Sequence, residues 1–408
     1  MKKAVKGVRK DNKDTKAVKK TVSDVKPVMT AQAQKPVTKK RDSNLELFRI
    51  ITMLLIIAHH FVVNSGLKDM DGPISSSPFT FNSLFLLIFG AWGKIGINCF
   101  VMITGYFMCK MDITVKKFAK LFLEVMFYRI AIQLVFWISG YEPFSVVKLA
   151  LTLIPVTDLT QDFTQCFLIF FLFIPFLNTL INHISERMHI GLIFLCGLTY
   201  VLLGTVRGGP FAVDMNYVSW FMVIYVIASY IRLYPKKWTG STARCGVLFF
   251  LSVIVAAASV IGCTVAGERF GRFAPYYLVS DSNSFLALIT GVFGFLFFKN
   301  IKIPYSKFIN TVAASSFGVL LIHTHSDSMR QWLWEDVLDN VGHFGDKLMP
   351  LYAIGSVIVI FAVCTVIDIL RINLLEKPFF RFWDNKMNGF IEKIKGFGDR
   401  IFRKMNIE

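Results

Sequence analysis

Long apolar runs alternate with short polar segments from about residue 45 to residue 370. A hydrocarbon core of about 30 Å is crossed by a helix of about 20 apolar residues, and backbone groups in lipid must bond within their own segment. The pattern therefore predicts an all-α, polytopic membrane bundle of about ten transmembrane helices. Their expected ranges are 45–65, 84–108, 118–139, 163–182, 189–206, 217–234, 244–266, 283–299, 309–326 and 348–370.

Composition supports this interpretation. The chain of 408 residues is 54% hydrophobic and has a mean hydropathy of +0.54, with 41 Phe. Only 18% of its residues are charged, whereas soluble domains contain about 25%. These values exclude a soluble globular domain.

The net charge of +18 is concentrated at the N-terminus. Residues 1–44 contain 14 Lys or Arg and 4 Asp, a net charge of +10. We expect a basic, disordered cytoplasmic tail over 1–44, a transmembrane bundle over 45–372 and a basic amphipathic cytoplasmic tail over 373–408. No aromatic residue lies among the N-terminal lysines, which favours anionic lipid headgroups over nucleic acid as the partner.

Loop charges predict the orientation. The loops expected to face the cytoplasm contain twelve Lys or Arg, and the five longer loops expected outside contain seven. By the positive-inside rule, both termini lie in the cytoplasm. The external loops 140–162, 267–282 and 327–347 are long enough to cover a polar substrate, and Trp332 and Trp334 are expected to anchor the last one at the interface.

Metal and disulfide sites are not predicted. The seven cysteines are irregularly spaced, contain no C-x-x-C pair and are interpreted as small apolar residues of the helices. His323 and His325 are two positions apart, so a helix presents them on different faces, which does not suit a metal site.

The first apolar run carries charged and titratable residues. His60 follows Arg49 by eleven positions, which on an α-helix is about three turns and roughly 16 Å on the same face, and Glu46 lies one turn before Arg49. Arg49 near the cytoplasmic end suits an anionic ligand, and His60, deeper in the membrane, suits proton transfer. Alternatively, Arg49 extends to the interface and His60 bonds a carbonyl. His59, rotated by about 100°, is expected to be a structural neighbour.

Two further segments suggest function. Thr104 and Gly105 interrupt an apolar helix, where small residues also serve close packing. Lys117 and Lys120 lie one turn apart at the start of the next helix, on the side expected for Arg49, although the positive-inside rule alone would place lysines there. Arg129 lies deeper in that helix and needs a partner such as Glu124 or an anionic ligand.

These segments together resemble the integral-membrane acyltransferases of family 3, which O-acylate bacterial surface glycans. The resemblance covers about residues 44–380. It rests on five segments in the expected order: Arg49 and His60 with ten residues between them, Phe100–Tyr106, Lys117-x-x-Lys120, Trp220–Arg232 and Ser316–His323. This sequence has Thr104 where Ser is usual, Lys for Arg in the basic pair, and Leu320 where Tyr often precedes the histidine.

The resemblance implies an enzyme that transfers an acetyl or other short acyl group from cytoplasmic acetyl-CoA to a hydroxyl of a polysaccharide or lipid-linked precursor. It implies catalytic roles for His60, Arg49 and Glu46. Arg49, Lys117, Lys120 and Arg129 would bind the CoA phosphates, and Thr104, Trp220 and His323 would contact substrate. A bacterial plasma membrane is the expected location, with membrane lipid and glycan-assembly proteins as further partners. The alternative is a transporter or flippase for an anionic or lipid-linked solute, which would use the same intramembrane charges.

Overall fold

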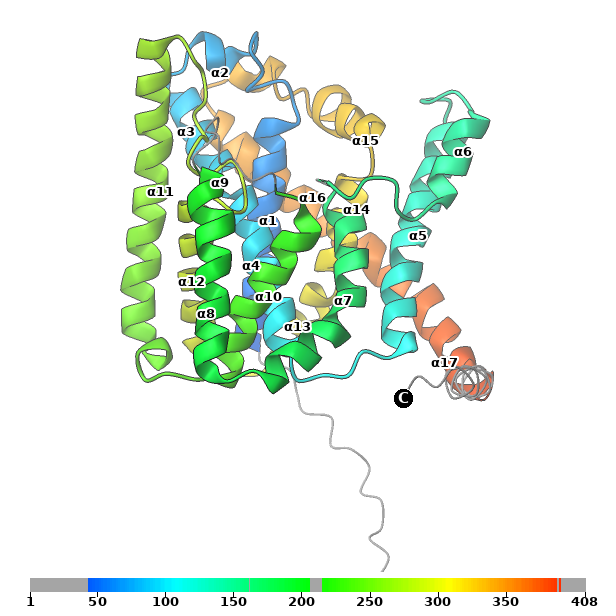
Figure 1. The fold of residues 1–408 in the computed structure, drawn as a ribbon. Coiled ribbons are helices and arrows are strands. Elements are labelled where there is room, and N and C mark those ends of the chain that lie inside the picture. Colours follow the sequence, from blue (N-terminus) through cyan, green and yellow to red (C-terminus); the bar gives the residue numbers. More distant parts are fainter. Residues whose placement is uncertain (1–42, 161, 206–214, 387–388, 390–408) are drawn as a thin grey trace, which may run out of the picture. The chain divides into compact units, whose positions relative to one another are not determined.

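The computed structural model describes residues 43–160, 162–205, 215–386 and 389, and these form helices and connecting segments without a β-strand. Most of the predicted N-terminal tail (1–42) and the end of the predicted C-terminal tail (387–388 and 390–408) lie outside the described residues. The fold below is therefore that of the bundle that begins at Ser43 (Figure 1).

Six continuous helices in the described part are long and apolar enough to cross a membrane. One consists of α3, a 3-10 turn and α4, and the last continues from α16 through a π-helical turn into α17. The elements are α1 (Ser43–Val63), α3 (Phe81–Phe89), η1 (Gly90–Trp92), α4 (Gly93–Met108), α5 (Val115–Ile138), α7 (Phe163–His183), α11 (Thr242–Phe270), α16 (Met349–Arg371), η6 (Ile372–Glu376) and α17 (Lys377–Lys386).

Shorter helices fill the remaining predicted spans. They are α8 (Glu186–Cys196), η2 (Gly197–Leu202), α9 (Leu203–Thr205), α10 (Tyr217–Leu233), α12 (Phe285–Asn300), α13 (Lys307–Ala314) and α14 (Ser316–His323). All ten predicted ranges therefore coincide with helix to within a few residues. Because several of these helices are short, the number of membrane crossings stays a prediction.

The predicted external loops are more ordered than expected. They contain α2 (Pro73–Ser76), α6 (Val146–Leu153), α15 (Asp327–Gln331), η4 (Trp332–Val337) and η5 (Gly342–Gly345), and η3 (Trp238–Gly240) lies between α10 and α11. The expected interfacial position is wrong for Trp334, whose ring is fully buried 5.9 Å from that of Phe61. Trp332 remains 39% exposed. The segment folds back over the end of α1, which a local pattern of aromatic residues does not reveal.

Polar side chains begin the helices where the sequence changes from loop to apolar run. Thr114, Asp162, Asn216 and Ser306 each accept a hydrogen bond from a backbone N–H of the first turn of α5, α7, α10 and α13. Such caps satisfy N–H groups that have no partner within the helix. At the C-terminal end of α11, Gly271 takes a left-handed backbone conformation (φ 66°), which glycine adopts without strain.

Helix α1 lies in the interior of the bundle and packs against α4, α12, α13, α14 and α16 (Figure 1). Glycines allow the closest approach. A Cβ on Gly93 would lie 2.2 Å from the His59 ring, and one on Gly96 would lie 2.8 Å from Ile56. A glycine also allows α4 and α10 to approach closely, because a Cβ on Gly105 would lie 2.9 Å from Ala228. Close packing therefore accounts for the small residue at position 105.

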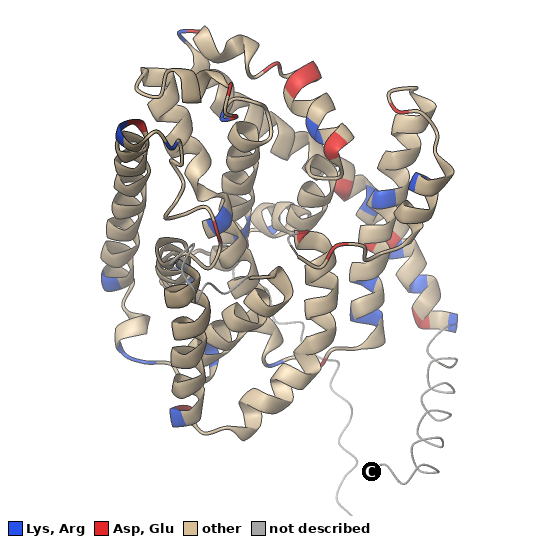
Figure 2. Ribbon diagram, turned by 45° about the horizontal axis from the view of Figure 1, so that its top comes forward, with Lys and Arg blue, Asp and Glu red and all other residues tan. Residues whose placement is uncertain are grey.

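Charged residues are concentrated at helix ends and in connecting segments (Figure 2). The exception is a buried network between α5 and α16. Arg371 donates to Asp368 at 2.8 Å, and to Glu124 and Glu376 at 2.9 Å each. The expected pairing of Arg129 with Glu124 is therefore wrong, because Arg371 takes that carboxylate.

Candidate functional site

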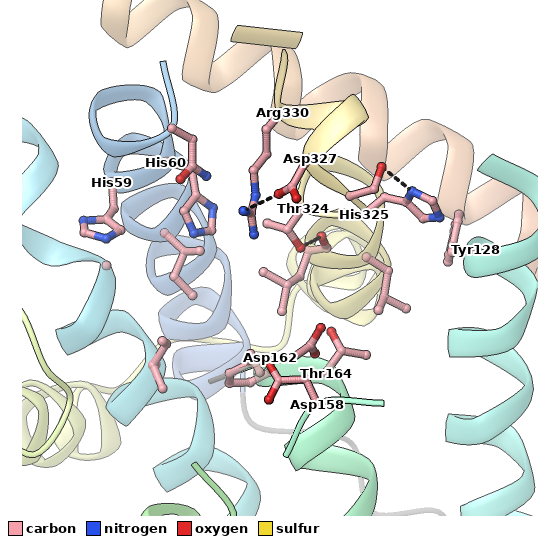
Figure 3. A pocket seen from close by; sticks show the side chains of 18 of the residues that line it. His59, His60, Tyr128, Asp158, Asp162, Thr164, Thr324, His325, Asp327 and Arg330 are labelled. Carbon is pink, nitrogen blue, oxygen red and sulfur yellow. Dashed lines mark hydrogen bonds and ion pairs between the residues drawn. The ribbon is translucent and has the colours of Figure 1, made fainter. Parts of the chain in front are cut away.

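A cavity of about 710 Å³ lies between α1, α4, α5, α7 and α14, and α15 and the segment before it border it on one side. His59 and His60 lie on one side of it, His325 and Tyr128 on the other, and Asp158, Asp162 and Thr164 below (Figure 3). Most of these positions carry polar or charged side chains. This is unusual for space enclosed by apolar helices and marks a functional site.

His60 is held by a second histidine. The Nδ1 atom of His60 lies 3.0 Å from Nε2 of His323, and Nδ1 of His323 lies 2.6 Å from the carbonyl oxygen of Val319. A carbonyl only accepts, so His323 donates from Nδ1, and its Nε2 then accepts from His60 Nδ1–H. This chain leaves Nε2 of His60 as an unprotonated acceptor, and His60 lines the cavity.

Packing of α14 against α1 brings this pair together. His323 ends α14 and is fully buried, and α14 packs against α1. His59 is turned away from this contact and its Nδ1 lies 2.6 Å from the carbonyl oxygen of Gly90. His59 thus contacts a backbone carbonyl and also lines the cavity, so its expected structural role stays a prediction.

Arg129 and His325 form the far wall. Arg129 donates to the carbonyl oxygens of Leu151 at 2.9 Å and Thr152 at 3.3 Å, both at the end of α6. His325 Nε2 lies 3.1 Å from the carbonyl oxygen of Arg129. Arg129 therefore belongs to the cavity of His60, far along α5 from Lys117 and Lys120.

Charged side chains of both signs surround the opening. Arg330 pairs with Asp327 at 2.9 Å, and Lys94 donates to the hydroxyl of Tyr217 at 2.7 Å. Lys148 pairs with Glu142 just outside. Burial acts to raise the pKa of Glu142, but hydrogen bonds from Lys148 and Gln133 outweigh it and keep that pKa below its ordinary value. Such a rim suits a ligand with many hydroxyl groups.

The floor of the cavity is aromatic. The ring of Phe100 lies 6.0 to 6.3 Å from those of Phe163, Phe167 and Phe317. These four rings come from α4, α7 and α14. Phe100 and Phe163 line the cavity, and Phe167 and Phe317 pack against them.

Arg49 and Glu46 lie at that other end, joined by an ion pair of 3.0 Å, and neither lines the cavity. The two lysines predicted to join them contact other groups. Lys120 pairs with Glu376 at 2.7 Å, and Lys117 donates to the carbonyl oxygen of Asp112 at 2.6 Å. Arg49, Lys117 and Lys120 therefore each contact a different partner in this structure.

Thr104 and Trp220 also lie away from the cavity. Thr104 donates to the carbonyl oxygen of Phe100 in its own helix at 3.3 Å. Trp220 is fully buried and donates from Nε1 to Asn98, which in turn donates to the carbonyl oxygen of Ser282 at 2.7 Å. Trp220 thus joins α10 to α4, whereas the Thr104 hydroxyl bonds only within α4.

Sequence reasoning missed Lys94 and Arg330 as cavity residues and did not pair His323 with His60. The signal for Lys94 was a lone cation within an apolar run. No local signal identifies the His60–His323 contact, because 263 positions separate the two residues. Within the described residues, no group of three or more His, Cys, Asp or Glu side chains is arranged to hold a metal ion.

Comparison with known proteins identifies the family. A family model described as an acyltransferase domain matches residues 42–369, which is most of the chain. Searches against curated proteins and against solved structures returned no match. With its apolar helices, the chain is a multi-pass membrane protein with a transferase domain. It belongs to the integral-membrane acyltransferases of family 3.

Proposed function

We propose that this membrane acyltransferase moves an acetyl or other short acyl group from cytoplasmic acyl-CoA to a hydroxyl of a cell-surface polysaccharide or of its lipid-linked precursor. The observation that carries the proposal is the tautomer of His60 set by His323. A neutral imidazole with its free Nε2 facing a polar cavity is equipped to act as a general base.

The chemical step follows from this arrangement. Nε2 of His60 takes the proton of the acceptor hydroxyl while its oxygen attacks the thioester carbonyl. The new C–O bond forms, the C–S bond breaks, and the proton passes from His60 to the departing CoA thiolate. Arg330 and Lys94 line the same cavity and favour the negative charge that develops on the carbonyl oxygen.

The two substrates approach from opposite ends in this proposal. The polar rim formed by Arg330, Asp327 and Lys94 suits the hydroxyl groups of a glycan. The donor enters from the end where α1 begins, which the loop charges predict to be cytoplasmic with both termini on that side. A bacterial plasma membrane fits such a reaction, with glycan-assembly proteins as additional partners.

His323 takes a different role from the substrate contact that the resemblance implied. It is fully buried behind His60 and is a positioning residue. Glu46 acts on Arg49 through their ion pair and has no place at the reacting atoms. His60 is thus the catalytic residue of the proposal.

Transfer of radiolabelled acetyl from acetyl-CoA, in membranes that contain the native glycan, tests the proposal. Membranes with the unaltered protein should label glycan or lipid-linked material, and membranes with His60→Ala should not. His183→Ala is the control, because that exposed ring bonds a carbonyl of its own helix and does not line the cavity. A transporter would consume no acetyl-CoA, so the absence of His60-dependent label would favour that alternative.

A further inference from the structure

Two cations lie without a carboxylate partner at the end of the bundle where α1 begins. Arg232 is in the last turn of α10, and Lys299 is in the last turn of α12. Among the described residues, neither side chain has an Asp or Glu within ion-pair distance. Lys299 donates to the side chain of Asn300 at 2.8 Å, and Arg232 donates from one terminal nitrogen to the Tyr106 hydroxyl at 2.8 Å.

Tyr106 brings these cations together. The guanidinium of Arg232 lies 4.6 Å from the centre of the Tyr106 ring, and the ring of Phe295 lies 5.2 Å from that of Tyr106. Lys299 follows Phe295 by one turn of α12, so it lies on the same side of that helix. The two charges are close enough to repel one another.

Arg49 lies at the same end of the bundle. The start of α1 is fixed to the end of α12, because Asn44 donates to the carbonyl oxygens of Phe298, Lys299 and Ile301 at 2.9 to 3.1 Å. Helix α4 runs antiparallel to α1, with Gly93 at His59 and Gly96 at Ile56. Tyr106, near the other end of α4, therefore lies near the level of Arg49.

A structural role does not account for both cations. Cations at helix C-termini do interact favourably with the helix dipole, but Asn44 already satisfies the last carbonyls of α12. The Nε atom of Arg232 is buried and has no hydrogen-bond partner. Half-buried cations without counter-charges are costly, and a bound anion would remove that cost.

We propose that Arg232 and Lys299, together with Arg49, bind the phosphates of the acyl-CoA donor. This inference rests on the proposed function and gives it a donor site. Arginine forms paired hydrogen bonds to phosphate and lysine adds a point charge. Lys117 and Lys120, which the sequence favoured for this role, contact Asp112 and Glu376 instead and are the matched controls.

Donors with and without phosphates test the proposal. The variants are Arg232→Gln and Lys299→Gln, with Lys117→Gln and Lys120→Gln as controls. A lost charged hydrogen bond corresponds to roughly a tenfold to hundredfold rise in KM for acetyl-CoA. With S-acetylpantetheine, which has no phosphate, kcat/KM should be unchanged. Equal losses with both donors would indicate a structural role and overturn the proposal, as would an unchanged KM for acetyl-CoA.

Direct binding of coenzyme A to the protein in lipid nanodiscs keeps this test separate from turnover. Arg232→Gln and Lys299→Gln should weaken binding by the same factors, and the two control variants should not. Failure of the unaltered protein to bind coenzyme A, or equal affinity in all variants, would overturn the donor site. A protein that binds coenzyme A through these cations but transfers no acetyl group would contradict the proposed function alone.

Discussion

Replacing His323 by Ala removes the group that fixes the tautomer of His60. In the native chain His60 Nδ1–H donates to His323 Nε2 at 3.0 Å, and His323 is itself fixed by the carbonyl of Val319. Without the second imidazole, the Nδ1–H of His60 loses its acceptor. His60 then gains by moving its proton to Nε2, where the ring cannot accept the proton of the acceptor hydroxyl.

The size of the effect follows from the cost of that lost acceptor. A buried donor without a partner costs about 1–3 kcal/mol, and each 1.4 kcal/mol changes an equilibrium or a rate tenfold. The productive tautomer of His60 should fall by this factor. We therefore expect kcat of His323→Ala to drop roughly 10- to 100-fold, whereas His60→Ala loses the base itself, about 10²–10⁴-fold.

Initial rates of acetyl transfer in proteoliposomes measure these values. His323→Gln is the matched variant, because its amide can donate to Val319 and accept from His60, and it should recover most of the lost rate. Wild-type kcat in His323→Ala, alongside an inactive His60→Ala, would refute the reasoning. An equal loss in the Gln and Ala variants would show that the site requires an imidazole rather than an acceptor.

Two further predictions concern stability. Arg371→Met leaves Glu124 in the bundle without its counter-charge, so the free energy of unfolding should fall by about 3–5 kcal/mol; an unchanged midpoint in a detergent unfolding assay would contradict this. Asn98→Ala leaves the indole N–H of Trp220 without an acceptor and should cost about 1–3 kcal/mol in the same assay, with Trp220→Phe partly restoring stability in the double variant.

The sequence determined the positions of the helices because each apolar run must satisfy its backbone groups internally. All ten predicted ranges are helical, with ends marked by residues such as Thr114 and Asp162. The spacing likewise placed Arg49 and His60 toward opposite ends of α1, since helical geometry fixes that distance. Local periodicity carries this information by itself.

Tertiary structure decided which of the polar residues meet. His323 contacts His60 across 263 positions, and Arg371, rather than Arg129, pairs with Glu124. Hydrophobic periodicity tells which residues lie in a helix but does not determine which helix faces which. For the same reason the sequence could not distinguish Lys117 and Lys120, which bind carbonyl and carboxylate oxygens, from Arg232 and Lys299, which have no carboxylate partner in the described part of the chain. Which side chains meet depends on which helices pack together. A glycine that allows close approach, or a buried ion pair, favours one pair of helices over another.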